Sequence, residues 1–176
     1  MKNILILVND GFEEVETITP YDMLKRVGCN VVLGSFKGEI KGAHNLNVKA
    51  DLVINWDNYK NFDYVILPGG PEYKFNKTSD LYKEIIKFYI STKGLACICA
   101  TPTILGEMGL LKGKDYTCFT PMNNNFGGNF TNASSTTSGN LVTGRSAGCA
   151  LDFSYSIVKY LFGEEKVKEL KEDIIY

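Results

Sequence analysis

The chain has 176 residues, a length typical of one domain, and its 19 basic and 20 acidic residues give a formal net charge of -1. A chain of this length buries about 70% of its unfolded surface, so its core needs neither a metal nor a disulfide. The near-neutral charge and the lack of any basic or aromatic-basic tract argue against a nucleic-acid partner.

The N-terminal apolar run from Ile4 to Val8 is too short for a signal peptide, and no stretch approaches the roughly 18 apolar residues that a membrane span needs. We therefore expect a cytoplasmic protein with no membrane partner. Five cysteines in irregular spacing fit free thiols better than disulfides. A zinc site is not expected, because there is no C-x-x-C pair and only one histidine.

Short apolar runs alternate with segments of helical periodicity along the chain. The runs predict parallel strands that are covered on both faces, and they span Ile4 to Val8, Val31 to Leu33, Tyr64 to Leu67 and Leu95 to Cys99. Helices are predicted from Val15 to Val27 with a stop at Gly28, from Leu81 to Tyr89 after a Thr78 or Ser79 cap, and from Cys149 to Phe162. This order predicts an α/β fold: a three-layer α/β/α sandwich with a mostly parallel sheet.

Two segments depart from this alternation. Residues 34–53 read as a hairpin excursion, and residues 123–139 read as a surface loop followed by a hairpin from Thr136 and Thr137 into Leu141 to Thr143. No internal repeat is present. We expect a single domain over residues 1–176.

Ligands of an open parallel sheet bind beyond the carboxyl ends of its strands. Four predicted loops meet at that edge, and they are residues 10–16, 68–71, 100–102 and 145–148. Candidate functional residues are therefore sought in these loops.

Cys99 ends an apolar run in LACICATPT, where a helix can begin. Thr101 suits the N-cap of that helix and Pro102 its first turn, and the helix would reach about Gly109. A thiol ahead of a helix feels the positive end of the helix dipole, which favours the thiolate. Cys97, inside the strand, is expected to be packed and inert. The alternative for Cys99 is a small buried hydrophobe of the same kind.

The glycine loop and an acidic segment could complete a site around this thiol. Backbone N–H groups of Gly69 and Gly70 could stabilise an oxyanion beside Cys99, although a plain turn explains these glycines equally well. Glu13 and Glu14 fit a role at a helix start. Glu16 lies near the apolar side of its helix and should point inward, where it would be a protonated hydrogen-bond donor or a general acid/base.

A cysteine hydrolase needs a base for its thiol. Ala100 follows Cys99, and His44 lies in the hairpin excursion, so a Cys–His hydrolase is poorly supported.

Five motifs in order carry a resemblance to a known family. They are GFEEVET, AHNLNVKAD, VILPGGP, CICATPT and GRSAGCALDF. The chain resembles the ThiJ/PfpI family, in the branch of the Parkinson-disease-associated protein deglycase and its bacterial relatives. The resemblance covers nearly the whole chain.

The resemblance implies a flavodoxin-like fold with a nucleophile-elbow cysteine, in a homodimer. It implies that Cys99 is the reactive cysteine, that Glu16 is the protonated glutamate that hydrogen-bonds it, and that Gly69, Gly70 and Ala100 supply backbone groups. It further implies redox sensing, glutathione-independent conversion of methylglyoxal to lactate, protein deglycation or chaperone-like protection. It implies no organic cofactor and no metal.

The chain also departs from the family pattern. Thr120 stands where many relatives have a histidine before proline, which removes an imidazole from the expected pocket. The family's Gly-Pro-Gly is Ser146-Ala147-Gly148 here, and Cys149 replaces a threonine. The further pocket candidates are His44, Thr120, Arg145 and Ser146.

Three functions remain open from the sequence. The first is a cysteine-dependent stress protein that senses oxidants or acts on small reactive aldehydes. The second is a non-catalytic chaperone-like or binding homodimer, which the missing histidine favours. The third, an amidase or peptidase, is the least supported.

Overall fold

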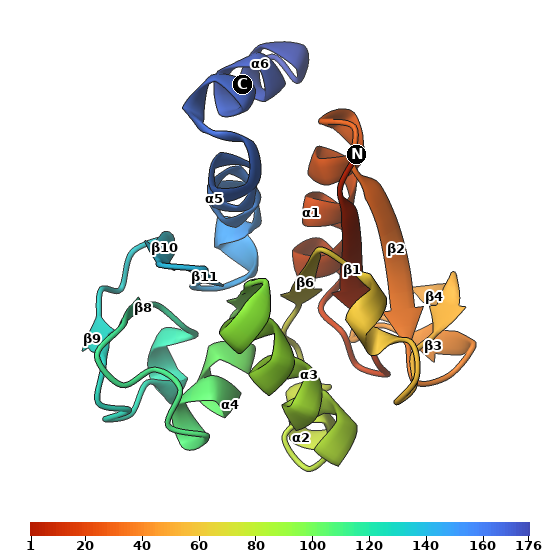
Figure 1. The fold of residues 1–176 in the computed structure, drawn as a ribbon, viewed down its shortest axis with the longest axis vertical. Helices are drawn as coiled ribbons and strands as arrows, with labels where there is room; N and C mark the ends of the chain where they lie inside the picture. Colours follow the sequence, from red (N-terminus) through yellow and green to blue (C-terminus); the bar gives the residue numbers. More distant parts are fainter.

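A central sheet of seven strands forms the middle layer of the protein, in the order β10-β11-β7-β6-β1-β2-β5. The computed structural model describes all residues from Met1 to Tyr176. The strands of this sheet are β1 (Asn3–Leu7), β2 (Asn30–Ser35), β5 (Leu52–Val53), β6 (Tyr64–Leu67), β7 (Leu95–Ile98), β10 (Ser135–Ser138) and β11 (Leu141–Gly144). All neighbours are parallel except β10 and β11, which form an antiparallel edge pair (Figure 1).

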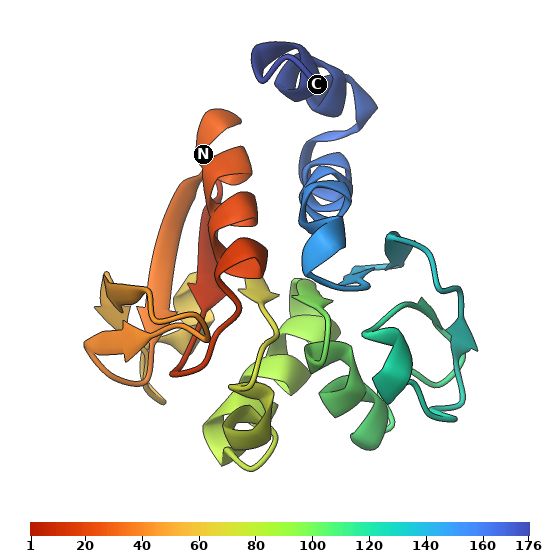
Figure 2. The ribbon, with the colours of Figure 1, turned by 180° about the vertical axis from the view of Figure 1, so that it is seen from behind.

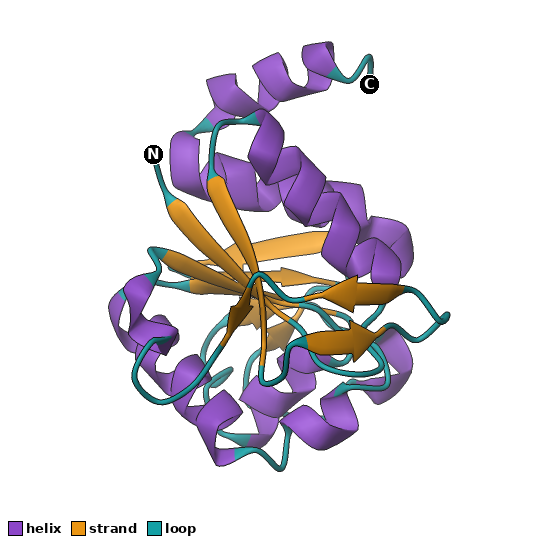
Figure 3. Cartoon of the chain, turned by 90° about the vertical axis from the view of Figure 1, so that its right-hand side faces the viewer, coloured by secondary structure: helices purple, strands orange, loops and turns teal.

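Helices cover both faces of the sheet (Figure 3). One face carries α1 (Glu14–Arg26) and α5 (Ala150–Phe162), which lie together in Figure 2, with α6 (Glu164–Asp173) beyond them. The other face carries α2 (Tyr73–Asn76), α3 (Asp80–Thr92) and α4 (Thr101–Glu107). The fold is the predicted flavodoxin-like α/β sandwich. No helix combines the length and the apolar character that a membrane crossing would require.

The uninterrupted apolar character of β1 follows from its central place. Ile4 and Ile6 join the core cluster under α1 and α5, whereas Leu5 and Leu7 join the cluster under α3 and α4. Because successive side chains of a strand point to opposite faces, both sets have to be apolar.

Both predicted excursions form strands. The hairpin of β3 (Glu39–Lys41) and β4 (Asn47–Lys49) stands apart from the main sheet, and the predicted hairpin around Thr136 is the pair β10–β11. The polar loop before β10 also holds β9 (Asn129–Phe130), which pairs with β8 (Asp115–Tyr116) and was not predicted. The 3-10 turns are η1 (Tyr59–Asn61), η2 (Thr120–Met122) and η3 (Ala147–Cys149).

Some predicted boundaries are wrong. β7 ends at Ile98, so Cys99 is outside the strand, and α5 begins at Ala150 because Cys149 belongs to η3. Thr101 is not the N-cap of α4: Ala100 takes that position, and the Thr101 hydroxyl donates to the Pro68 carbonyl (2.6 Å) instead. Ser79 does cap α3, by accepting the Tyr82 N–H (3.3 Å). α6 was not predicted.

Candidate functional site

Cys99 occupies a tight turn between β7 and α4. Its φ of 64° lies in the left-handed region, which is uncommon for any residue other than glycine. Two neighbouring segments hold this backbone: the Cys99 N–H donates to the Gly144 carbonyl of β11 (3.0 Å), and the Phe119 N–H donates to the Cys99 carbonyl (2.7 Å). A side chain on such a turn is presented at the carboxyl edge of the sheet.

Cys99 is also the most accessible of the five thiols. It is partly exposed, whereas the other four cysteines are buried, and Cys97 and Cys118 have no exposed surface. Burial raises the pKa of the Cys97 thiol well above its usual value, so this residue stays protonated in the core. A soluble reagent therefore meets Cys99 before any other cysteine.

The buried carboxyl of Glu16 lies against this thiol. Glu16 has no exposed surface, and its Oε2 accepts the Gly69 N–H (2.8 Å). Its Oε1 has no hydrogen-bond partner, and the neighbouring Cys99 thiol is a second group whose hydrogen bonding lowers the pKa of the carboxyl. Helix α1, which follows the first strand, thus places the Glu16 carboxyl group beside the end of β7.

Gly69 makes this approach possible. A Cβ at this position would lie 2.7 Å from the Cys99 Cβ and 2.8 Å from Glu16 Oε2, closer than real side chains come. Glycine is therefore the residue that lets the loop, the thiol and the carboxyl meet.

The Glu16 and Cys99 groups titrate together. Burial raises the pKa of Glu16 to about 7, although hydrogen bonds from Cys99 and from the Gly69 N–H oppose the rise. Burial, and then the negative charge of an ionised Glu16, raise the pKa of Cys99, whereas the N–H groups of Ala100 and Gly70 lower it. A protonated Glu16 instead donates to the sulfur and favours the thiolate. The pair therefore holds a transferable proton near neutral pH.

The three predicted backbone groups divide into two roles. The N–H groups of Gly70 and Ala100 hydrogen-bond to the thiol, in the position where they could bind an oxyanion. The Gly69 N–H is directed to Glu16 instead.

Thr120 and Arg145 both hydrogen-bond to Asn132, a residue that the sequence did not indicate. The Thr120 hydroxyl donates to Asn132 Oδ1 (2.9 Å), and Arg145 Nη1 donates to the Asn132 carbonyl (2.8 Å). Asn132 adopts a φ of 53°, but in an asparagine-rich loop the sequence carries no signal that distinguishes it. Ser146 lies nearby in sequence, and its Oγ is 3.9 Å from the Cys149 sulfur.

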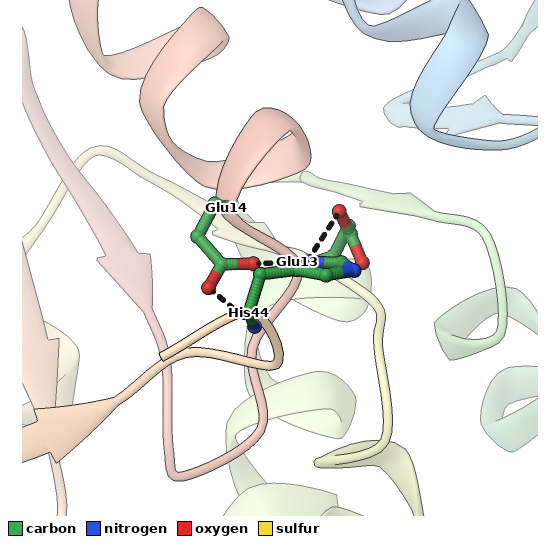
Figure 4. A group of neighbouring side chains, drawn as sticks. All are labelled: Glu13, Glu14 and His44. Carbon is green, nitrogen blue, oxygen red and sulfur yellow. Dashed lines mark hydrogen bonds and ion pairs between the residues drawn. The ribbon is translucent and has the colours of Figure 1, made fainter. Parts of the chain in front are cut away.

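His44 lies on the turn between β3 and β4, against the first residues of α1 (Figure 4). Its Nδ1 is 2.8 Å from Glu14 Oε2 and 3.6 Å from Glu13 Oε1, and its backbone N–H donates to Glu14 Oε1 (2.7 Å). These carboxylates raise the pKa of His44. The three side chains offer atoms of the kind that bind divalent cations, all within 4.8 Å, but a carboxylate–imidazolium ion pair also accounts for their arrangement.

The sequence profile of the DJ-1/PfpI family matches residues 2–160. The chain belongs to the DJ-1/PfpI family. It is 31% identical to Protein dj-1beta of Drosophila melanogaster over 99% of this chain and 97% of the relative. It is 36% identical to a deglycase of Pyrococcus abyssi over 90% of this chain and 98% of the relative. The solved structure of Drosophila melanogaster DJ-1beta aligns with a TM-score of 0.86 at 28% identity, over 99% of this chain and 97% of that one.

Membership of the DJ-1/PfpI family confirms the resemblance seen in the five motifs, and the matched span contains every candidate site residue.

A buried hydrogen-bond network around Glu72 lies behind the glycine loop of the site. Glu72 is almost fully buried behind the glycine loop, where its Oε2 accepts the Asn9 N–H and Asn9 Nδ2 donates to Asn76 (2.9 Å). Burial raises the Glu72 pKa well above its usual value, so the group is neutral. The sequence PEYKFN, which reads as an exposed turn, gives no sign of this network.

Proposed function

We propose that this member of the DJ-1/PfpI family acts on small reactive aldehydes such as methylglyoxal, with Cys99 as the nucleophile and Glu16 as its proton partner. The observation that carries the proposal is the hydrogen bond between a buried carboxyl group, whose pKa is raised to about 7, and the one partly exposed thiol. A group that gains and loses a proton near neutral pH is suited to acid–base catalysis.

The addition step follows from the geometry. The Cys99 sulfur attacks the aldehyde carbon, and the N–H groups of Gly70 and Ala100 are available to the oxygen that becomes negative. Glu16 supplies the proton to that oxygen. Rearrangement and hydrolysis of the adduct would give lactate without glutathione. Deglycation is the related reaction on an aldehyde already attached to a protein, and the similar protein of Pyrococcus abyssi carries the name deglycase.

Redox sensing is a second candidate, and the contrast among the cysteines favours it. Thiolate character and accessibility control oxidation by peroxide, and Cys99 combines partial exposure with two backbone N–H groups, those of Ala100 and Gly70, that lower its pKa. The two activities use one thiol and can coexist in the protein. An amidase or peptidase is not proposed, because Ala100 rather than a histidine follows Cys99.

We also propose that the protein is a homodimer in a reducing compartment such as the cytoplasm. Val15, Ile18 and Leu46 are between 43% and 48% exposed on α1 and on the β3–β4 turn, and they would be covered by a second copy. The five cysteines are all free thiols. A chaperone-like activity of such a dimer would survive the loss of Cys99, which separates it from the proposed chemistry.

The function is tested by incubating purified protein with methylglyoxal and measuring both loss of the aldehyde and formation of lactate. We expect turnover by the wild type and none by Cys99→Ser or Glu16→Ala. Equal rates for wild type and Cys99→Ser would refute the enzymatic function, whereas selective peroxide oxidation of Cys99 would still support a sensor.

A further inference from the structure

The isomerisation that follows aldehyde addition needs a group that moves a proton between two carbons. Neither Ala100 after the thiol nor Thr120 can do this, and Glu16 already accepts the Gly69 N–H through Oε2 and serves as the proton partner of the thiol. His44 is the only histidine of the chain. Imidazole is the side chain best suited to proton transfer near neutral pH.

His44 is held in a defined orientation. The Ala43 N–H donates to the Phe12 carbonyl (2.8 Å), Asn45 takes a φ of 73°, and the His44 N–H donates to Glu14. These two hydrogen bonds hold the β3–β4 turn against the start of α1. Glu14 and Glu13 both face Nδ1, so this nitrogen carries a hydrogen, and Nε2 makes no hydrogen bond within the protein (Figure 4). The ring is 72% exposed, so Nε2 is available to a ligand.

A short chain of contacts links this imidazole to the thiol. Glu13, whose carboxylate faces the ring, donates its backbone N–H to the Gly69 carbonyl (3.0 Å). Gly69 in turn packs directly on Cys99 and Glu16. The charge of Glu13 also contributes to the raised pKa of Glu16. The hairpin turn after β2 and the loops after β1, β6 and β7 thus meet at the carboxyl edge of the sheet.

We propose that His44, oriented by Glu14 and Glu13, is the proton-transfer group for the adduct on Cys99. This inference rests on the proposed aldehyde chemistry. Glu16 acts in the addition step and His44 in the step that follows it.

The step balances with water as the only co-reactant. Addition of the thiol to methylglyoxal forms the bond from sulfur to the aldehyde carbon and moves the thiol proton to the aldehyde oxygen. His44 Nε2 removes the hydrogen of that carbon as a proton, and the electron pair left behind forms the double bond of an enediolate. The imidazolium returns the proton to the neighbouring carbon, and the hydroxyl proton of the first carbon passes to the oxygen of the second. The first carbon is thereby oxidised and its neighbour reduced, which gives a thioester. Water cleaves the thioester to lactate and the free thiol.

The test separates addition from proton transfer in the intact protein. In buffer with EDTA, which keeps divalent cations from the cluster, methylglyoxal adducts on Cys99 are measured by mass spectrometry and lactate is measured over time. The key variant is His44→Gln, whose amide can still donate to Glu14 but cannot act as a base. Glu165→Gln, on the exposed surface of α6, is the control.

We expect His44→Gln to form the adduct at nearly the wild-type rate and to lose about 100-fold or more in kcat for lactate, the usual contribution of general acid–base catalysis. Added imidazole should restore part of the turnover in His44→Ala but none in Cys99→Ser.

Wild-type kcat in His44→Gln would overturn the inference and leave the proposed function standing. Equal loss of adduct and lactate would also overturn it, because His44 would then only support the site. A wild type that makes no more lactate than Cys99→Ser would refute the enzymatic function, and the role of His44 with it.

Discussion

The carboxyl group of Glu16 hydrogen-bonds to the thiol of Cys99, and its burial raises its pKa to about 7. Helix α1 contributes Glu16, and Cys99 directly follows β7, the fifth strand of the main sheet in chain order. The pair is oriented by Gly69, which binds the carboxyl and leaves room for the thiol.

Glu16 should make the stability of the protein depend on pH. Its folded-state pKa of about 7 lies above its ordinary value of 4.5, so the folded state holds this proton more tightly than the unfolded chain. The contribution is therefore full below about pH 4.5 and is lost as pH rises through 7. Compared with Glu16→Gln, the wild type should lose up to about 3 kcal/mol in free energy of unfolding between these limits. Urea unfolding from pH 4.5 to 8 measures this, and parallel curves for the two proteins would contradict it.

Gly69→Ala should disable the site. The new Cβ would overlap with the Cys99 Cβ and with Glu16 Oε2, so the loop must shift away from both. We expect a loss of about 1–3 kcal/mol in stability, as for other overpacked sites, together with slower alkylation of Cys99 by iodoacetamide. Gly38→Ala is the matched control, because a Cβ there would contact nothing within 4 Å. Equal alkylation rates for the two variants would show that Gly69 does not organise the site.

Glu72 should tolerate replacement by an uncharged amide but not the loss of its side chain. Burial keeps this carboxyl neutral, so Glu72→Gln preserves both the size and an oxygen acceptor for the Asn9 N–H. Glu72→Ala leaves that N–H without its partner and opens a cavity, which should cost about 2–4 kcal/mol. Thermal unfolding at pH 7 compares the two variants. A larger loss in Glu72→Gln than in Glu72→Ala would mean that the group is charged.

Mild peroxide should oxidise Cys99 before the other cysteines. Cys97, two residues earlier, has the same chemistry but no exposed surface, and it serves as an internal control in the same peptide region. Peptide mass spectrometry after a short exposure should find added oxygen on Cys99 and none on Cys97. Comparable oxidation of the two residues would remove the basis for a sensor.

The sequence predicted the architecture and the central pair because both leave local signals. Continuous apolar runs indicate buried parallel strands, and the change from strand to helix after LACIC locates Cys99 at the edge where ligands bind. Glu16 was expected to point inward because it lies beside Val15 and Ile18. It is buried, but Val15 and Ile18 are about half exposed, so the buried face of α1 is not the one that the sequence indicated.

Features that depend on distant contacts were not predictable in this way. Thr101 looked like an N-cap, but its hydroxyl bonds to Pro68 on another loop. Asn132 became important only because Thr120 and Arg145 both reach it. Glu72 reads as an exposed turn residue, since nothing local indicates that Asn9 and Asn76 enclose it. Each case is set by tertiary packing rather than by neighbours along the chain.

The central claim is that Cys99 performs aldehyde chemistry with the help of Glu16. The most direct measurement is lactate formation from methylglyoxal, without glutathione, by wild type, Cys99→Ser and Cys29→Ser. Cys29 is a buried thiol just before β2, at the opposite edge of the sheet. We expect turnover by wild type and Cys29→Ser and none by Cys99→Ser, whereas equal lactate formation by all three proteins would refute a role for Cys99 in this chemistry.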